Sequence, residues 1–406
     1  MTLGKWKKWQ IAFAVFGMLA IGLAFLWPKA PEPPDTVTSL AQLEAHIESL
    51  VEFGTPPGMS LVVVKNGAIV YSKGFGWADH PRQIAAKPQT VYHWWSCTKI
   101  VTAIAILQLR EQGKLRLNDS VTQYLPFFKV QHPLATSRVI TIQHLLNHSS
   151  GLPDAGFRIM SWIHHDGEPS VDQTAMVERV LPGFSTLAFE PGDHAEYTNI
   201  GYMVLGAIIE KVAGVAYEDY IRENILEPLG MKHTGFVYIK AMEPYEAAGA
   251  HPLFDMWTPL IPFLAPSYVR EISGNHVWLT RVYNDQTPPS GLIGPATDAA
   301  RLLTAYLNGG ELDGRRILSR ESITAMTLEG RIRGKADDPQ INRRQGIGWQ
   351  VYDDKERLMI KHDGGGLGFS TVMQMYPDEK LGFVLFTNDV MCKGWRIVNL
   401  AAGLDW

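Results

Sequence analysis

The sequence predicts an α+β fold in which an antiparallel β-sheet is flanked by helices and a mainly helical lobe is inserted. Three observations support this. Strand-like segments lie near both ends of the chain, and helical patterns lie between them. An isolated hairpin is not stable in water, so the early strands are expected to join the late strands in one sheet. One transmembrane helix is expected at the N-terminus.

The first 27 residues have the composition of a signal anchor. The start, MTLGKWKKWQ, carries three lysines, and residues 11–27 follow without a charge. A basic segment before an apolar run of roughly 17–25 residues predicts membrane insertion with the lysines in the cytoplasm. Pro28 and Pro31 flank Ala30 and leave no clear cleavage site, which favours an uncleaved signal anchor over a cleaved signal peptide.

A proline-rich linker at residues 28–37 follows, and residues 38–406 are expected to form one domain outside the cytoplasm. Apolar residues recur at helical spacing over residues 38–53. Two β-rich runs then flank Asn66-Gly67, a strong hairpin signal. The apolar stretch after Trp94-Trp95 predicts a buried helix over residues 96–110, closed near Gly113.

The inserted lobe is expected at roughly residues 126–285. Apolar spacing predicts a helix over residues 200–212, with Gly214 as its stop. His144 and His148 precede a Ser-Ser-Gly segment and are interpreted as structural residues at a helix end, with a position lining the cleft as the less favoured alternative. Residues 240–285 look irregular and aromatic, which fits either a loop over a pocket or a variable insertion. The sequence favours neither alternative.

The C-terminal part is expected to contain one helix, four strands and a closing helix. The first helix covers residues 298–307 and ends at Asn-Gly-Gly. The segments GIGWQVYDD, ERLMIKHDG, FSTVMQMYP and LGFVLFTND have the pattern of consecutive antiparallel strands. Their turns are expected near residues 353–354, 364–368 and 378–379. The closing helix is expected to begin at about Lys393.

The composition excludes several classes of protein. Of 406 residues, 46% are hydrophobic and 19% are charged, which predicts a sizeable core. The formal net charge of −4 argues against a nucleic-acid partner. Two cysteines cannot form a disulfide framework. Neither H-E-x-x-H nor paired CxxC occurs, so no metal or other cofactor is expected.

The stretch SCTK places Ser96 three residues before Lys99. Residues three apart share a helix face. A buried lysine loses proton affinity and can accept a proton from a serine, which then becomes a nucleophile. Free N–H groups at a helix start can stabilise an oxyanion. Taken alone, the pattern fits a capped helix with an outward-pointing lysine better than a catalytic site, because short motifs often match by chance.

Two further stretches carry polar groups near structural boundaries. In YTN, Tyr197 and Asn199 stand just before the predicted helix of the lobe. A tyrosine near a lysine can act as a base, and an asparagine can bind a substrate amide. In KHDGGGLGF, His362 stands at a strand end before Gly364 and Gly365. Glycines allow a backbone to approach a ligand closely.

In this order and spacing, SCTK, YTN and HDG resemble the S-x-x-K, Y-x-N and K-T-G or H-x-G motifs of the serine β-lactamase and penicillin-binding protein superfamily. The chain is most similar to the branch of class C β-lactamases, D-stereospecific peptidases and esterases. The resemblance covers about residues 38–406. It implies a β-lactamase/transpeptidase-like fold and catalysis through an acyl-enzyme.

The resemblance also implies roles for individual residues. Ser96 corresponds to the acylated nucleophile, and Lys99 and Tyr197 share general-base and general-acid duty. Asn199 orients the substrate and the lysine. The backbone N–H groups of Ser96 and Gly365 correspond to the oxyanion hole.

Four positions depart from the pattern of the superfamily. His362, ahead of Gly364, takes the place of the usual lysine and is expected to be mostly neutral. Asp363 stands where many relatives have Thr or Ser, and its side chain is expected to point away from His362. Asp154 and Ala155 supply no glutamine amide, which class C lactamases use. These departures weaken the lactamase interpretation more than the hydrolase interpretation.

The sequence therefore predicts a membrane-anchored serine hydrolase in the periplasm that acts on amides or esters. Small-molecule or peptide substrates are expected, including D-amino-acid peptides, small esters and, weakly, β-lactams. The alternative is a penicillin-type sensor that is acylated without turnover. Sensors commonly carry a multi-helix signalling portion, whereas this chain has one apolar span, which favours an enzyme. The sequence favours no particular oligomeric state.

Overall fold

The computed structural model describes residues 30–132, 138–165, 167, 172–253, 258–335, 343–353 and 357–406. The predicted signal anchor at residues 1–27 lies outside this part of the chain. Within the described ranges, no single helix has the length and apolar composition needed to cross a membrane. Two core segments, Asn199–Ala213 and Tyr217–Leu226, meet these criteria only as a pair, bent by 79°.

The main sheet joins both ends of the domain, as predicted. Its order is β13-β14-β15-β16-β17-β1-β2-β3. Strand β1 pairs antiparallel with β17 from Met59 opposite Thr387 to Lys65 opposite Leu381. Asn66 and Gly67 both have positive φ at the predicted hairpin turn. The strands are β1 (Gly58–Lys65), β2 (Ala68–Asp79), β3 (Ile84–Ala85), β13 (Arg343–Gln345), β14 (Gln350–Asp353), β15 (Leu358–Gly366), β16 (Phe369–Tyr376) and β17 (Leu381–Thr387).

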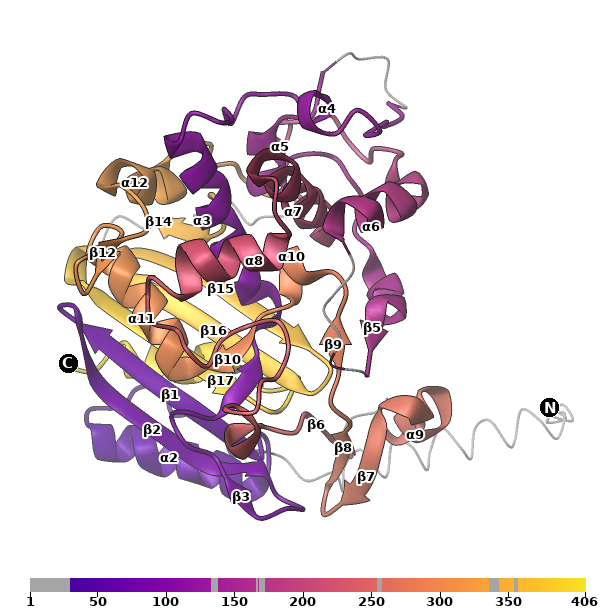
Figure 1. Ribbon diagram of the computed structural model, residues 1–406. Helices are drawn as coiled ribbons and strands as arrows, with labels where there is room; N and C mark the ends of the chain where they lie inside the picture. The colour runs from indigo at the N-terminus through magenta and orange to yellow at the C-terminus, as the bar shows by residue number, and fades with distance from the viewer. Residues whose placement is uncertain are drawn as a thin grey trace, which may run out of the picture.

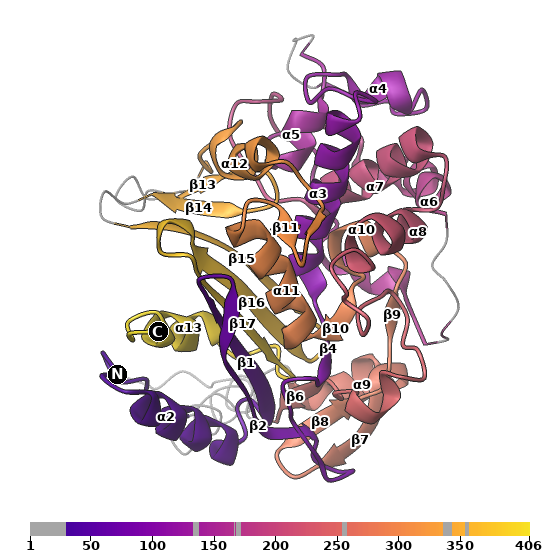
Figure 2. The ribbon, with the colours of Figure 1, turned by 60° about the vertical axis from the view of Figure 1, so that its left-hand side comes forward.

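Helices cover both faces of this sheet. Helices α2 (Leu40–Phe53) and α13 (Gly394–Ala401) lie on one face, and α3 (Thr98–Glu111) and α11 (Ala296–Leu307) lie on the other (Figures 1 and 2). Strand β1 is buried on both sides, so its apolar residues divide between two cores. Leu61 and Val63 pack toward α2 and α13, whereas Val62 and Val64 pack toward α3.

The inserted lobe is mainly helical but also contains short strands. Its helices are α4 (Val121–Tyr124), α5 (Ile142–Leu146), α6 (Gln173–Val180), α7 (Asn199–Ala213), α8 (Tyr217–Ile221), α9 (Ile261–Leu264) and α10 (Thr287–Ser290). The expectation that residues 240–285 are irregular is wrong. Strands β6 (Ala250–Pro252), β8 (His276–Leu279) and β7 (Val269–Ser273) form a small sheet in that order. They are too short and too mixed in composition to show a clear alternation.

The remaining elements connect the lobe to the sheet. Strand β4 (Val91–His93) pairs with β10 (Ile293–Pro295), and β5 (Ile163–His164) pairs with β9 (Tyr283–Asn284). Strands β11 (Glu311–Leu312) and β12 (Arg315–Arg316) form a small hairpin, which α12 (Arg320–Leu328) follows.

The entry into the first buried helix differs from the prediction. Ser96 lies in a 3-10 turn, η1 (Trp95–Cys97), and α3 begins only at Thr98. Trp95 has a φ of +47°, in the left-handed region, because the chain bends sharply between β4 and α3. The Cys97 side chain at the N-cap makes no capping hydrogen bond. Ser96 is therefore not a helix cap.

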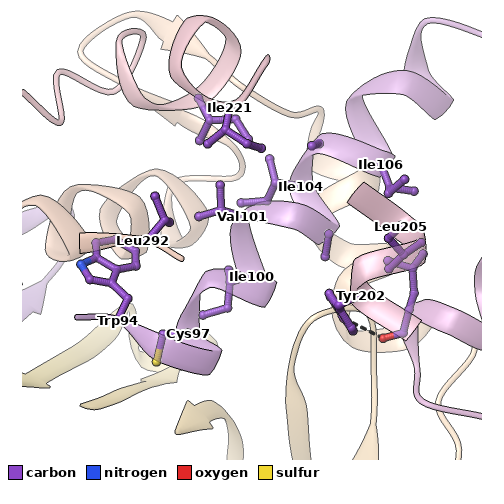
Figure 3. Close-up of a cluster of buried hydrophobic side chains, with 14 of the residues drawn as sticks. Trp94, Cys97, Ile100, Val101, Ile104, Ile106, Tyr202, Leu205, Ile221 and Leu292 are labelled. Carbon is purple, nitrogen blue, oxygen red and sulfur yellow. Dashed lines mark hydrogen bonds between the residues drawn. The ribbon is translucent and has the colours of Figure 1, made fainter. Parts of the chain in front are cut away.

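Helix α3 is the centre of the larger core. All its residues from Thr98 to Leu109 are buried, including Lys99. Figure 3 shows Ile100, Val101 and Ile104 of α3 in one apolar cluster with Leu205 of α7 and Ile221 of α8. A lysine near the start of such a helix cannot reach bulk water.

We predict that Gly206→Ala destabilises the domain. Gly206 of α7 faces α10, and a Cβ there would lie 2.1 Å from Cγ of Pro288. The proline ring cannot rotate away, so the overpacking should cost about 1–3 kcal/mol in free energy of unfolding, measured by urea titration. Gly201→Ala in the same helix is the matched control, because its nearest atom lies at 3.4 Å. Equal stabilities of the two variants would contradict this account of the contact.

Candidate active site

Four predicted residues meet at one place. The Tyr197 hydroxyl donates to Ser96 Oγ at 2.8 Å, and Lys99 Nζ lies 3.2 Å from the same oxygen. Lys99 Nζ also donates to Asn199 Oδ1 at 2.7 Å. The serine comes from η1 and the lysine from α3, whereas Asn199 is the first residue of α7 and Tyr197 lies two residues before it. Packing of α7 on α3 thus assembles the two motifs into one site.

The environment of Lys99 makes the neutral amine accessible near physiological pH. Its side chain is fully buried, and this burial lowers its pKa to about 7. A neutral amine has two N–H groups and one lone pair. Asn199 Oδ1 and the Pro289 carbonyl, at 2.7 and 3.0 Å, can accept the two N–H groups. The lone pair then faces Ser96 Oγ and can accept its proton.

The phenol of Tyr197 is a proton donor in this arrangement. Burial raises its pKa above the ordinary value, so the hydroxyl stays protonated at neutral pH. It donates to Ser96 Oγ rather than accepting from it. Of the two groups that contact the serine oxygen, Lys99 is therefore the one able to accept the serine proton first.

His148 packs against Tyr197, which agrees with the alternative that this histidine lines the cleft. His148 is buried, has a φ of +61°, and its ring centroid lies 4.4 Å from that of Tyr197. Its Nδ1 accepts the backbone N–H of Thr198 at 3.3 Å. His144, by contrast, caps α5 together with Thr141, as its interpretation as a structural residue implied. The contact of His148 arises from packing between distant segments, so no local pattern announces it.

Asp154 fixes the orientation of Asn199. Its Oδ1 accepts the backbone N–H of Asn199 at 2.7 Å and the side-chain amide at 3.1 Å. The amide nitrogen of Asn199 therefore turns toward Asp154, and its oxygen turns toward Lys99. Asp154, which departs from the class C pattern, thus positions Lys99 through Asn199.

His362 lies beside this group but carries no charge. Its side chain is buried, and burial, followed by the charge of nearby Lys99, lowers its pKa to about 3. Nδ1 contacts the main-chain oxygen of Asp363 at 2.9 Å, whereas the Asp363 carboxylate binds Lys361 at 2.9 Å. As predicted, the carboxylate points away from the imidazole. The position usually held by a lysine therefore supplies no cation.

The glycines after His362 let β15 approach the serine turn. A Cβ on Gly364 would lie 2.4 Å from the Trp94 carbonyl oxygen and 3.1 Å from the Ser96 nitrogen. The prediction of a turn over residues 364–368 is wrong at its start, because β15 continues to Gly366 and the turn lies at residues 367–368. Gly365 is exposed in this strand. The strand segment that contains Gly365, whose N–H group is predicted to belong to the oxyanion hole, thus lies beside Ser96.

Comparison with known proteins agrees with this geometry. The family model described as beta-lactamase matches residues 43–391. The chain belongs to the β-lactamase family. The predicted superfamily is therefore confirmed.

Individual relatives of this β-lactamase-family chain cover most of its length. Protein flp of Staphylococcus aureus strain MW2 is 34% identical over 355 residues, which are 87% of this chain and 64% of flp. The chain thus spans less than two thirds of that relative. An octameric penicillin-binding protein homologue from Pyrococcus abyssi is 27% identical, with a TM-score of 0.72 over 90% of this chain and 77% of its own.

A D-amino acid amidase from Ochrobactrum anthropi SV3 has the same fold. It is 21% identical and has a TM-score of 0.71 over 89% of this chain and 97% of its own. At this identity the likeness shows the fold alone. The predicted α+β architecture of the β-lactamase and transpeptidase superfamily is confirmed.

Other reactive groups near the site are inert. Burial raises the pKa of the Cys97 thiol to about 12, and its Sγ donates to the His362 carbonyl at 3.3 Å. Among the residues that the structure describes, no group of three or more His, Cys, Asp or Glu side chains could hold a metal ion.

We predict that the labelling of Ser96 by a fluorophosphonate depends on the protonation of Lys99. The rate should rise as the pH increases through about 7, because only the neutral amine accepts the serine proton. Below this midpoint it should fall about tenfold per pH unit. Mass spectrometry of labelled peptides measures the rate, and Ser96→Ala is the blank. A rate that stays constant from about pH 5 to pH 9 would contradict the role of Lys99.

Proposed function

We propose that this protein hydrolyses amide or ester substrates through an acyl-enzyme on Ser96. The observation that carries the proposal is the buried Lys99 amine, whose two N–H groups have acceptors and which faces Ser96 Oγ at 3.2 Å. Membership of the β-lactamase family supports the same reaction.

In the first step, Ser96 Oγ attacks the substrate carbonyl carbon as Lys99 takes its proton. The carbonyl oxygen becomes an oxyanion, which the main-chain N–H groups of Ser96 and Gly365 stabilise. When the bond to the leaving group breaks, the Tyr197 phenol gives its proton to the departing nitrogen or oxygen. The proton on Lys99 then restores the phenol. Water releases the acyl group by the same steps in reverse order.

The electrostatics of the site favour substrates without an obligatory carboxylate. His362 is neutral and buried, and the Asp363 carboxylate is bound by Lys361. A lysine at position 362 would provide a charge-assisted hydrogen bond, which is stronger than the bond from a neutral imidazole. The favoured substrates are therefore small esters and D-amino-acid amides or peptides, with β-lactams as weak substrates.

We predict that a substrate panel separates hydrolase from sensor. The panel contains p-nitrophenyl esters, D-amino-acid amides and a chromogenic cephalosporin. Steady turnover of an ester or amide is expected, and Ser96→Ala should reduce it by a factor of about 10³ or more. The melting temperature of the variant should stay close to that of the wild type, because Ser96 caps no helix.

Two other outcomes would point elsewhere. Stoichiometric acylation of Ser96 without turnover would support the penicillin-type sensor. Unchanged hydrolysis by Ser96→Ala would exclude Ser96 as the nucleophile.

We predict that His362→Lys improves the use of carboxylate-bearing substrates. Their KM should fall about three- to tenfold relative to the KM of neutral esters, because an ammonium group replaces a neutral imidazole. The added cation also lies near Lys99 and should shift the pH midpoint of labelling downward. His362→Gln is the neutral control. An equal change for charged and neutral substrates would show that residue 362 does not contact the carboxylate.

The same proposal includes a membrane anchor and a periplasmic domain. Lysines at positions 5, 7 and 8 precede an uncharged run at residues 11–27, which supports insertion with the domain outside the cytoplasm. We predict that the protein remains in the membrane fraction after carbonate washing and keeps its full length. A mature N-terminus near residue 31, found by N-terminal sequencing, would contradict an uncleaved anchor.

A further inference from the structure

A cavity separate from the active site lies next to the turn η1 that carries Ser96. Its volume is about 320 Å³, and its lining includes His93, Tyr238 and Phe369. Ser96, Lys99 and Tyr197 are not among its lining residues. Much of its wall comes from residues 243–249 and 270–282. Both ranges belong to the segment 240–285, for which a loop over a pocket was one of the two interpretations of the sequence.

The cavity shares its supporting segments with the active site. His93 is the last residue of β4, three residues before Ser96, and its ring centroid lies 5.8 Å from that of Trp95. On its other side, the His93 ring lies 5.1 Å from Phe369, which pairs with Gly366 at the end of β15. A ligand in this cavity would contact the segments that hold the nucleophile and the oxyanion stretch.

Two closed ion pairs form rigid parts of the wall. Arg270 binds both carboxylate oxygens of Asp79, at 2.7 and 2.8 Å. Arg281 binds Glu246 through two hydrogen bonds, and its guanidinium carbon lies 4.7 Å from the centroid of the Tyr238 ring. Bidentate pairs of this kind fix geometry and leave little capacity for a ligand.

Other polar groups of the wall still have bonding capacity. The nearest carboxylate contact of the Arg82 guanidinium is Asp79 at 3.7 Å, and 60% of the Arg82 side chain is exposed. Within the described ranges, Glu243 has no ion-pair partner and neither ring nitrogen of His93 has a hydrogen-bond partner. His93 is 3% exposed, and burial lowers its pKa to about 4. The ring nitrogens of His93 are open to the cavity, where a ligand can form a hydrogen bond with them.

We infer that this cavity binds a zwitterionic group of amino-acid size, with its carboxylate at Arg82, its ammonium at Glu243 and a hydrogen bond to His93. The lining contains three arginines (Arg82, Arg270, Arg281) and three acids (Asp79, Glu243, Glu246), so its formal charge is zero. A ligand with one charge of each sign matches this balance. The volume is at the lower end of the roughly 300–1,000 Å³ usual for ligand sites.

Calorimetry on the full-length Ser96→Ala protein in detergent tests this inference, because it needs no turnover. The probes are D-alanine, L-alanine and D-alanyl-D-alanine, with propionate and ethylamine as analogues that carry one charge. At least one zwitterion should bind about tenfold more tightly than both analogues. If no zwitterion binds more tightly than the analogues, the inference is overturned.

Charge-removing variants locate the ligand. Arg82→Gln should weaken zwitterion and propionate binding about three- to tenfold and leave ethylamine unchanged. Glu243→Gln should weaken zwitterion and ethylamine binding and leave propionate unchanged. Arg116→Gln and Glu178→Gln, exposed and away from the cavity, are the matched controls. His93→Phe keeps the ring contacts with Trp95 but removes both nitrogens, so it should also weaken zwitterion binding. Affinities unchanged by Arg82→Gln and Glu243→Gln would overturn the inference.

Two sources can supply this chemistry, and the probes distinguish them. If the ligand is a short peptide substrate whose two termini supply the two charges, the dipeptide should bind most tightly, and phosphonylation of Ser96 in the wild type should weaken dipeptide binding. If it is a free amino acid, alanine should bind equally well before and after phosphonylation. Binding is measured without catalysis, so a failure of the proposed hydrolase activity would leave this test intact.

Discussion

The rest of the site depends on the burial of the Lys99 amine. An ammonium without a close carboxylate costs several kcal/mol in a protein interior, so the neutral form is favoured. A neutral amine still needs acceptors for its two N–H groups, and Asn199 and Pro289 provide them. These acceptors come from α7 and α10, so both helices must pack closely against α3. Gly206 permits this close packing, because a side chain at its position would collide with Pro288 and separate α7 from α10.

A second constraint is the exposure of Ser96 beside a lysine that must stay buried. The chain satisfies both through the 3-10 turn, in which Trp95 adopts a left-handed conformation that costs about 1–2 kcal/mol. Burial of the Trp95 ring against His93 and Gly366 offsets this cost. Because the turn also lies against β15, a side chain larger than glycine at position 364 would push the oxyanion stretch away from the serine.

Local patterns predicted much of this structure, and the errors have physical causes. The Asn-Gly hairpin, the joined sheet and helices α2, α7 and α11 follow from turn chemistry and apolar spacing. The start of α3 was misplaced, because helical spacing says nothing of the strain at Trp95. The glycines of β15 resemble a turn in sequence, but close approach to another segment requires them. Ser96, Lys99, Tyr197 and Asn199 were found through their motifs, whereas His148 and Asp154 reach the site through packing.

Burial also decides where charge can act in this protein. It lowers the pKa of His93 to about 4 and of His362 to about 3, and it lowers the pKa of His148 well below its ordinary value. None of the three imidazoles can then become charged near neutral pH, and the raised pKa of Tyr197 keeps its phenol neutral as well. Lys99 is thus the group in contact with Ser96 whose charge changes near pH 7. Arg82 and Glu243 line the neighbouring cavity together with His93. Proton transfer and recognition of charge are therefore separated in space, and a substrate group can be selected by charge without disturbing the pKa on which the nucleophile depends.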